Sequence, residues 1–155
     1  MLLLATALPL AGCRQADGPL PPEDGETPNR LADIARDLQN VAAGQSDKEL
    51  ADDLVVFVEP PSAEPAVREL SRRVSQALGG RNVTPEAASE LARQLWLAVG
   101  ARELSPRQVA VLQEDVQKSL AGLGVSEERA QPVVEQIAEV QRLVTRRQKR
   151  WYELF

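Results

Sequence analysis

Three stretches in the second half of the chain begin in the same way, one every 21 residues. Their candidate helix caps are Thr84, Ser105 and Ser126, each preceded by Val or Leu, in the segments "VTPE", "LSPR" and "VSEE". A Ser or Thr at this position accepts a hydrogen bond from a backbone N–H that the first helical turn leaves free. A period of 21 leaves room for a helix of about 16 residues and a short turn. We therefore expect three successive antiparallel helices.

The apolar residues of these three stretches keep the same offsets from their caps. Leu91, Leu112 and Val133 are in phase, and so are Leu95, Val116 and Ile137. Duplication of one unit and convergence of similar amphipathic helices both account for this pattern, and both predict the same architecture. Pro132 lies inside the last stretch, where its missing N–H predicts a kink or a restart of the helix.

The first half of the chain also carries helix start and stop signals. Thr27 with Pro28 predicts a helix start, and Gly44 ends the apolar pattern that follows. Ser46 and Glu49 have the spacing of a capping box, and Ser62 is the candidate cap of a third helix. The three apolar faces are Leu31, Ile34, Leu38 and Val41; Leu50, Leu54 and Phe57; and Val67, Leu70, Val74 and Leu78.

The segment "LVVFV", residues 54–58, is the one place where a strand competes with a helix. The preceding capping box, and the lack of a second strand to pair with, favour the helix. Aromatic residues make up only 3% of the chain, so the core must consist mainly of Leu, Val, Ile and Ala. We expect an all-α fold, with five or six amphipathic helices forming an antiparallel bundle over residues 27–155.

The chain before this bundle divides into two parts. Residues 1–12, "MLLLATALPLAG", are uncharged and too short to span a bilayer, which takes about 20 residues. They match the apolar core of a signal peptide. Residues 13–26 hold the single cysteine, Cys13, and then prolines, glycines and acids with almost nothing to bury. This second part is expected to be a flexible tether.

Leu10, Ala11, Gly12 and Cys13 resemble the lipobox of bacterial lipoproteins at every position. The resemblance implies that a peptidase recognises the first three residues and cleaves after Gly12, and that the Cys13 thiol carries a diacylglyceryl group in the membrane. The usual Lys or Arg before the apolar run is missing, and an upstream start would supply it. A lone buried cysteine in an apolar helix is the alternative interpretation.

The resemblance also implies a location. A lipoprotein of this kind belongs to the cell envelope and faces the periplasm or the cell exterior. In enteric bacteria an Asp directly after the lipidated cysteine retains the protein in the inner membrane. Arg14 stands there in this chain, which favours the outer membrane if the source has one.

Composition excludes several kinds of chemistry. The chain has no His, one Cys and one Met, so it lacks the commonest general base and metal ligand and cannot form an internal disulfide. Its net charge of -5 disfavours nucleic-acid binding. We expect no catalytic, cofactor-binding or metal-ligating residues, and no enzyme. One acidic cluster has either a cation-binding role or a helix-dipole role, and its members are Asp47, Glu49, Asp52 and Asp53.

The C-terminal segment concentrates positive charge and aromatic residues. Contact with lipid headgroups, an anionic envelope polymer or an acidic partner is one interpretation. The other is that the cations offset the negative end of a helix while Trp151, Leu154 and Phe155 pack back on the bundle. Trp96 is expected at the edge of the core, and its exposure would indicate a binding groove. The residues predicted to contact a partner are Arg146, Arg147, Lys149, Arg150, Trp151 and Tyr152.

The segment "ELSPRQVAVL", residues 103–112, resembles two unrelated families. Leu104 to Gln108 look like the opening of a helix in LuxR-type DNA-binding domains. The same Leu-Ser-x-x-Gln approximates the Leu-Thr-x-x-Gln motif of Spy and CpxP periplasmic proteins. A plain helix start, with Ser105 as cap and Pro106 in the first turn, also explains these letters. We expect a non-enzymatic lipoprotein whose helical domain binds or supports another envelope component. The alternative is a Spy/CpxP-like chaperone or stress sensor.

Overall fold

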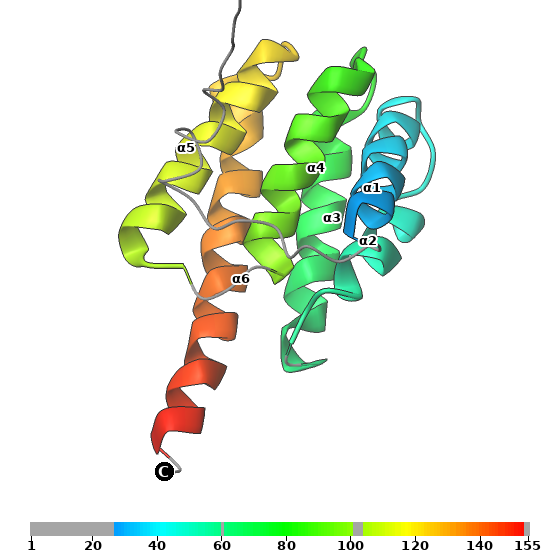
Figure 1. Ribbon diagram of the computed structural model, residues 1–155. Coiled ribbons are helices and arrows are strands. Elements are labelled where there is room, and N and C mark those ends of the chain that lie inside the picture. Colours follow the sequence, from blue (N-terminus) through cyan, green and yellow to red (C-terminus); the bar gives the residue numbers. More distant parts are fainter. Residues whose placement is uncertain (1–26, 60, 101–103, 154–155) are drawn as a thin grey trace, which may run out of the picture.

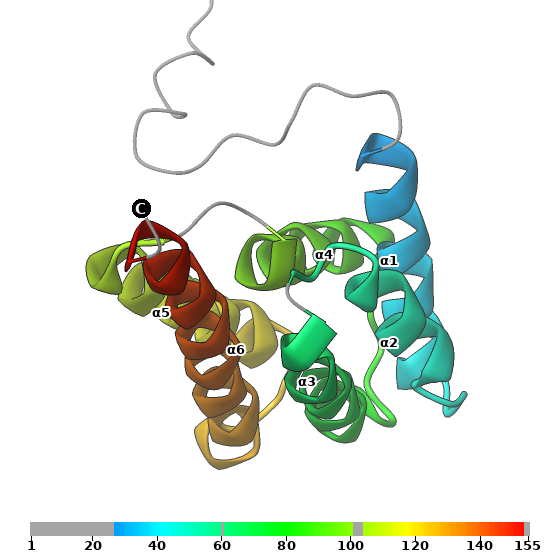
Figure 2. The same cartoon turned by 90° about the horizontal axis from the view of Figure 1, so that it is seen from below.

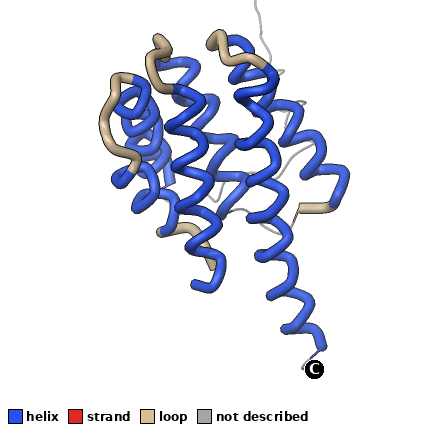
Figure 3. The backbone as a smooth tube through the Cα atoms, turned by 180° about the vertical axis from the view of Figure 1, so that it is seen from behind, coloured by secondary structure: helices blue, strands red, loops and turns tan. Residues whose placement is uncertain are grey.

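The computed structural model describes residues 27–59, 61–100 and 104–153, and within these ranges it contains helices and no strand (Figures 1 and 3). The predicted all-α fold is therefore confirmed, with six α-helices. A single turn of 3-10 helix, η2, covers Pro61–Ala63. The α-helices are α1 (Thr27–Ala42), α2 (Lys48–Val55), α3 (Glu64–Leu78), α4 (Pro85–Gly100), α5 (Pro106–Gly122) and α6 (Glu127–Glu153).

The helices form a bundle in which α3 and α4 lie between two outer pairs (Figure 2). On one side, α1 packs against α4, and α2 packs against α3. On the other side, α6 packs against both α3 and α5. From α3 to α6 successive helices alternate in direction (Figure 1), as short connections between helices favour. The antiparallel arrangement is thus confirmed.

The three caps spaced by 21 residues are present. Thr84 Oγ1 accepts from the N–H of Ala87 at 3.2 Å, and Ser126 Oγ accepts from Arg129 at 3.2 Å. Ser105 forms a full capping box with Gln108, because each side chain accepts from the other residue's backbone N–H, at 2.9 and 3.1 Å. The residue before each cap is buried, which fixes how the chain enters the helix: Val83, Leu104 and Val125.

Two other predicted caps, Ser46 and Ser62, are wrong. Ser46 Oγ accepts from the N–H of Lys48 and not from that of Glu49, so it closes a turn just before α2, which begins after Asp47. Ser62 lies within η2, and Ala63 precedes α3. In both places a local turn uses the residues that would otherwise cap a longer helix. α2 ends at Val55, and the segment "LVVFV" becomes a helix end followed by a turn.

The predicted apolar faces meet in one aliphatic core. Leu91, Leu112 and Val133 are buried, as are their in-phase partners one turn later. Trp96 is also buried, at 2% exposure, so its indole does not line an open groove. Its ring meets that of Phe57 edge to face, with ring centroids 6.4 Å apart, a geometry that aromatic pairs favour.

Pro132 does not interrupt α6, which runs unbroken from Glu127 to Glu153. The predicted restart is therefore wrong. Neighbouring helices bond to the carbonyls around it: Arg73 Nη1 donates to the Pro132 oxygen at 2.9 Å, and Gln113 Nε2 donates to the Val134 oxygen at 2.9 Å. These bonds from α3 and α5 hold this part of α6 in place, so one lost backbone bond is tolerated.

Candidate functional site

The predicted lipidation site lies outside the described residues. Leu10, Ala11, Gly12 and Cys13 all precede Thr27, where the described part of the chain begins. The same holds for the tether, residues 13–26. Lipidation and the flexible tether therefore stay predictions. In the described ranges, no helix combines the length and the apolar character that a bilayer-spanning segment needs.

The predicted partner-contact residues lie in the last turns of α6. The helix stays continuous to Glu153, and its end extends well beyond the ends of its neighbours (Figures 1 and 3). Val144, at 7% exposure, is buried and is the last residue of α6 whose side chain the structure describes. Side chains beyond it are not described, but their backbone is helical. The residues concerned are Arg146, Arg147, Lys149, Arg150, Trp151 and Tyr152.

Arg142 marks the point where this charged segment begins. Its guanidinium forms two hydrogen bonds with the carboxylate of Glu139, three residues earlier in α6. This pairing raises the pKa of Arg142 and neutralises its charge locally. Arg142 and four more cations fall within residues 142–150, which contain no Asp or Glu. The positive field of this end of α6 therefore comes from the residues after Arg142.

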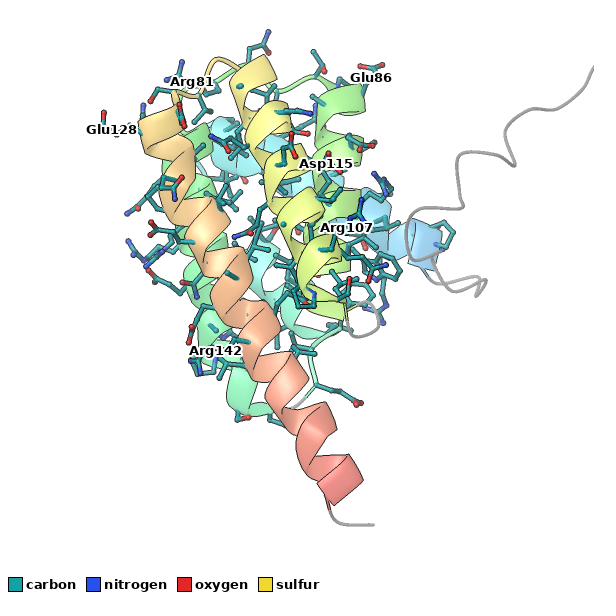
Figure 4. All side chains as sticks on the ribbon, turned by 90° about the vertical axis from the view of Figure 1, so that its left-hand side faces the viewer. Arg81, Glu86, Arg107, Asp115, Glu128 and Arg142 are labelled. Atoms are coloured by element: carbon teal, nitrogen blue, oxygen red, sulfur yellow. The ribbon has the colours of Figure 1, made fainter. Side chains whose placement is uncertain are left out.

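Charges of both signs are mixed on the face formed by α5 and α6. Arg107 and Asp115 extend from α5 (Figure 4). Glu128 extends from the start of α6, and Arg142 extends from α6 near the last residues whose side chains are described. Within α5, Lys118 pairs with Glu114 at 3.2 Å. Such mixing produces no strong field of one sign. Residues 142–150 of α6 differ from the rest of this face because all their charged side chains are positive.

The predicted acidic cluster is dispersed over several partners. Asp52 binds Arg68 of α3 at 3.1 Å. Asp47 ends up as the N-cap of α2, without a side-chain cap bond. In the ranges that the structure describes, no three acidic or sulfur ligands gather in a way that could hold a metal ion. The negative charge of Asp53 instead acts on Asp37 of α1.

Asp37 is a buried acid that the sequence reasoning missed. It is 2% exposed, and its Oδ2 has no hydrogen-bond partner. Burial raises the pKa of Asp37 to about 8, and the nearby carboxylates of Asp53 and Glu49 raise it further, while Arg36 acts in the opposite direction. The sequence spacing could have indicated that Asp37 is buried. Asp37 lies three residues after Ile34 and four before Val41, so it falls on the apolar face of the helix.

A small cavity opens where α1 meets the start of α2, next to Asp37. Its volume is about 180 Å³, below the roughly 300 Å³ at which small-molecule sites begin. Its lining is polar and contains no activated nucleophile beside a base. The space suits water or a small polar group rather than an organic substrate. The lining residues are Asp37, Asn40, Gln45, Ser46, Lys48 and Glu49.

The segment that resembles two families has a structural role. The Ser105 and Gln108 side chains are both used in the capping box, and Pro106 takes the first helical position. Leu104 is buried in the core. Four of the five residues that carry the resemblance therefore have a structural role at the start of α5. No family model, curated protein or solved structure matches this chain.

Proposed function

We propose that this protein is a lipid-anchored helical binding module of the cell envelope. Cys13 holds it to the membrane, and the free end of α6 contacts an acidic envelope protein or an anionic envelope polymer. The domain acts as a non-enzymatic scaffold that keeps this contact at a set distance from the membrane.

The end of α6 is the observation that carries the proposal. Its backbone continues past the neighbouring helices (Figure 1), and residues 142–150 hold five of the chain's 18 basic residues and none of its 23 acidic ones. A cationic helix end with adjacent aromatics fits an anionic surface, because Arg and aromatic residues are enriched at interfaces.

The N-terminal sequence supports the membrane side of the proposal. The match of Leu10 to Cys13 to a lipobox provides an anchor, and two acyl chains bind a bilayer stably at about 0.8 kcal/mol per buried methylene. Residues 14–26 then separate anchor and bundle. At about 3 Å per residue when extended, such a tether spans some tens of Å.

In-cell crosslinking with mass spectrometry tests both parts. Three full-length proteins are compared with the wild type: Cys13→Ser, a variant with Arg146, Arg147, Lys149 and Arg150 changed to Gln, and a matched control. The control carries the same change at four cations elsewhere on the bundle: Arg30, Arg81, Arg107 and Lys118.

We expect one dominant crosslinked partner for the wild type and for the control. The α6 variant should lose this partner while it stays in the membrane fraction, and Cys13→Ser should leave the membrane fraction. A partner that is retained by the α6 variant, or lost equally by the control, contradicts the role of α6. Membrane retention of Cys13→Ser contradicts the anchor.

The alternative function is a Spy/CpxP-like chaperone, suggested by the segment 104–108. The capping role of Ser105 and Gln108 explains that segment without a chaperone. Suppression of aggregation of an unfolded client by the purified protein distinguishes the two. Suppression at equimolar ratio, together with many weak crosslinks in cells, would favour the chaperone over the specific binding module.

A further inference from the structure

The cavity between α1 and the start of α2 is lined by polar side chains, one of them a buried carboxyl group. We propose that this cavity binds one organic cation that donates N–H bonds, an ammonium or guanidinium group. The site involves neither Cys13 nor the end of α6, so it is independent of the function proposed above. It lies on the side of the bundle away from α5 and α6 (Figure 2).

Asp37 is the residue that points to a ligand. Its side chain lines the cavity and is part of a residue that is only 2% exposed. In the part of the chain that the structure describes, no donor bonds to its Oδ2. A carboxylate buried without a donor is costly. Because χ2 of Asp is broad, a small rotation presents either carboxyl oxygen to the cavity, where a cation supplies the donor.

The other lining residues are rich in hydrogen-bond acceptors. Glu49 contributes a second carboxylate, and Asn40 and Gln45 contribute amide oxygens, so acceptors come from α1, from α2 and from the turn between them. Ammonium and guanidinium groups carry only N–H donors, which is the complementary set. Gln45 and Glu49 are exposed, so a ligand reaches the cavity from solvent at this end.

The size and charge of the cavity disfavour other ligands. Its volume of about 180 Å³ corresponds to roughly six waters at about 30 Å³ each, enough for a cationic end group and too little for a cofactor. In the described ranges, no three acidic or sulfur ligands gather to hold a metal ion. An anion would be repelled by Asp37 and Glu49, since Lys48 is the one cation among these lining residues.

The charged groups around Asp37 leave its carboxyl without a counter-ion. On α2, Asp53 and Glu49 add negative charge, and on α1, Arg36 pairs with Asp33 at 2.9 Å. Lys48 is exposed at the rim of the cavity. The cations of α3 and α4 have other partners: Arg68 with Asp52 and Glu64, Arg72 and Arg73 with Glu69, and Arg93 with Glu90.

Protons compete with the cation for Asp37. Burial raises the pKa of Asp37 to about 8, so without a cation the carboxyl holds its proton at neutral pH. A bound cation stabilises the ionised form, and binding therefore releases this proton. The apparent affinity should rise by about tenfold per pH unit up to about pH 8 and level off above it.

An amide chemical-shift titration of the full-length chain tests the site. The probes are methylammonium and methylguanidinium chloride at constant ionic strength, with tetramethylammonium chloride, which has no N–H donor, as the control salt. The backbone amides of Asn40, Gln45 and Lys48 report binding. The wild type is compared with Asp37→Asn, Lys48→Gln and Asp115→Asn. Asp115 is a partly buried aspartate of α5 outside the lining, so it is the matched control.

We expect saturable shifts with both N–H probes at pH 8.5 and none with tetramethylammonium. Asp37→Asn should weaken binding at least tenfold, because the buried counter-charge is lost. Lys48→Gln should strengthen binding, because a like charge at the rim is removed, and Asp115→Asn should stay within twofold of the wild type. The site would be overturned by equal responses to all three salts, by the absence of a saturable shift, or by equal losses in Asp37→Asn and Asp115→Asn.

The pH dependence of wild-type binding needs no variant, so it tests the role of Asp37 even if Asp37→Asn fails to fold. A rise in affinity from pH 6 to pH 8 is the expected result, and a flat profile would overturn that role. A blocked Gly-Arg-Gly peptide identifies the source of the cation. Tighter binding than methylguanidinium indicates an Arg side chain of a protein, and weaker binding indicates a free small cation.

Discussion

Asp37 occupies a position of α1 where an apolar side chain would be expected, and its carboxyl makes the stability of the domain depend on pH. Its folded-state pKa of about 8 lies above the value of about 3.9 in an unfolded chain. The folded state therefore holds the extra proton, and its contribution is complete below about pH 4. This contribution is lost as the pH rises through 8.

Asp37→Asn should stabilise the domain at alkaline pH, because a neutral amide removes the cost of burying a charge next to Asp53. At pH 8.5 the free energy of unfolding is expected to rise by about 1–3 kcal/mol. Urea unfolding at pH 4.5 and pH 8.5 measures the change. At pH 4.5 the gain should shrink towards zero, and a gain of the same size at both pH values would contradict the raised pKa.

Gly100 is required by close packing against Phe57. A Cβ atom at Gly100 would come within 2.4 Å of the Phe57 Cβ, whereas a Cβ at Gly122 meets nothing within 4 Å. Gly100→Ala should therefore destabilise the domain by about 1–3 kcal/mol through overpacking. Gly122→Ala should be neutral or stabilising by about 0.5–1 kcal/mol, because Ala loses less backbone entropy in a helix. Thermal unfolding of both variants checks this, and equal effects would contradict the contact.

At the scale of elements, some helices have a side-chain N-cap bond and others do not: Ser105 caps α5, whereas α3 has no such bond. Ser105→Ala should cost about 1 kcal/mol, because it removes the acceptor for the Gln108 N–H and breaks the capping box. Ser62→Ala is the matched control, since Ser62 is exposed within η2 and does not cap α3. Its effect should stay within about 0.5 kcal/mol. Chemical denaturation measures both, and an equal loss in the control would refute the assignment of the caps.

The N-caps were predicted correctly where residues adjacent in sequence decide where the helix starts. Thr84, Ser105 and Ser126 each have a favourable side chain and an apolar residue before the cap, and all three cap their helices. It failed at Ser46 and Ser62, where the chain must turn between helices in a small space. Those turns are set by where α2 and α3 pack, which residue spacing does not show.

At the scale of the whole molecule, the end of α6 should be dispensable for folding. Removal of residues 146–155 deletes the cationic end of α6, where the helix extends beyond its neighbours (Figure 1). The free energy of unfolding is expected to change by less than about 0.5 kcal/mol, while the dominant crosslinked partner is lost. A drop of several kcal/mol would mean that Trp151 and its neighbours pack on the bundle, as the alternative interpretation of this segment holds.

The sequence by itself determined the helical class, the extent of the bundle from Thr27 and the in-phase apolar faces, because periodicity and caps are local properties. It also supplied the lipobox resemblance at Cys13, which lies outside the described residues. Only the tertiary structure decided that Trp96 is buried, that α6 continues through Pro132 as one helix, and that Asp37 is buried between helices. These depend on which helices become neighbours, and contacts between residues 16 or more positions apart are set by packing of the whole bundle rather than by local sequence.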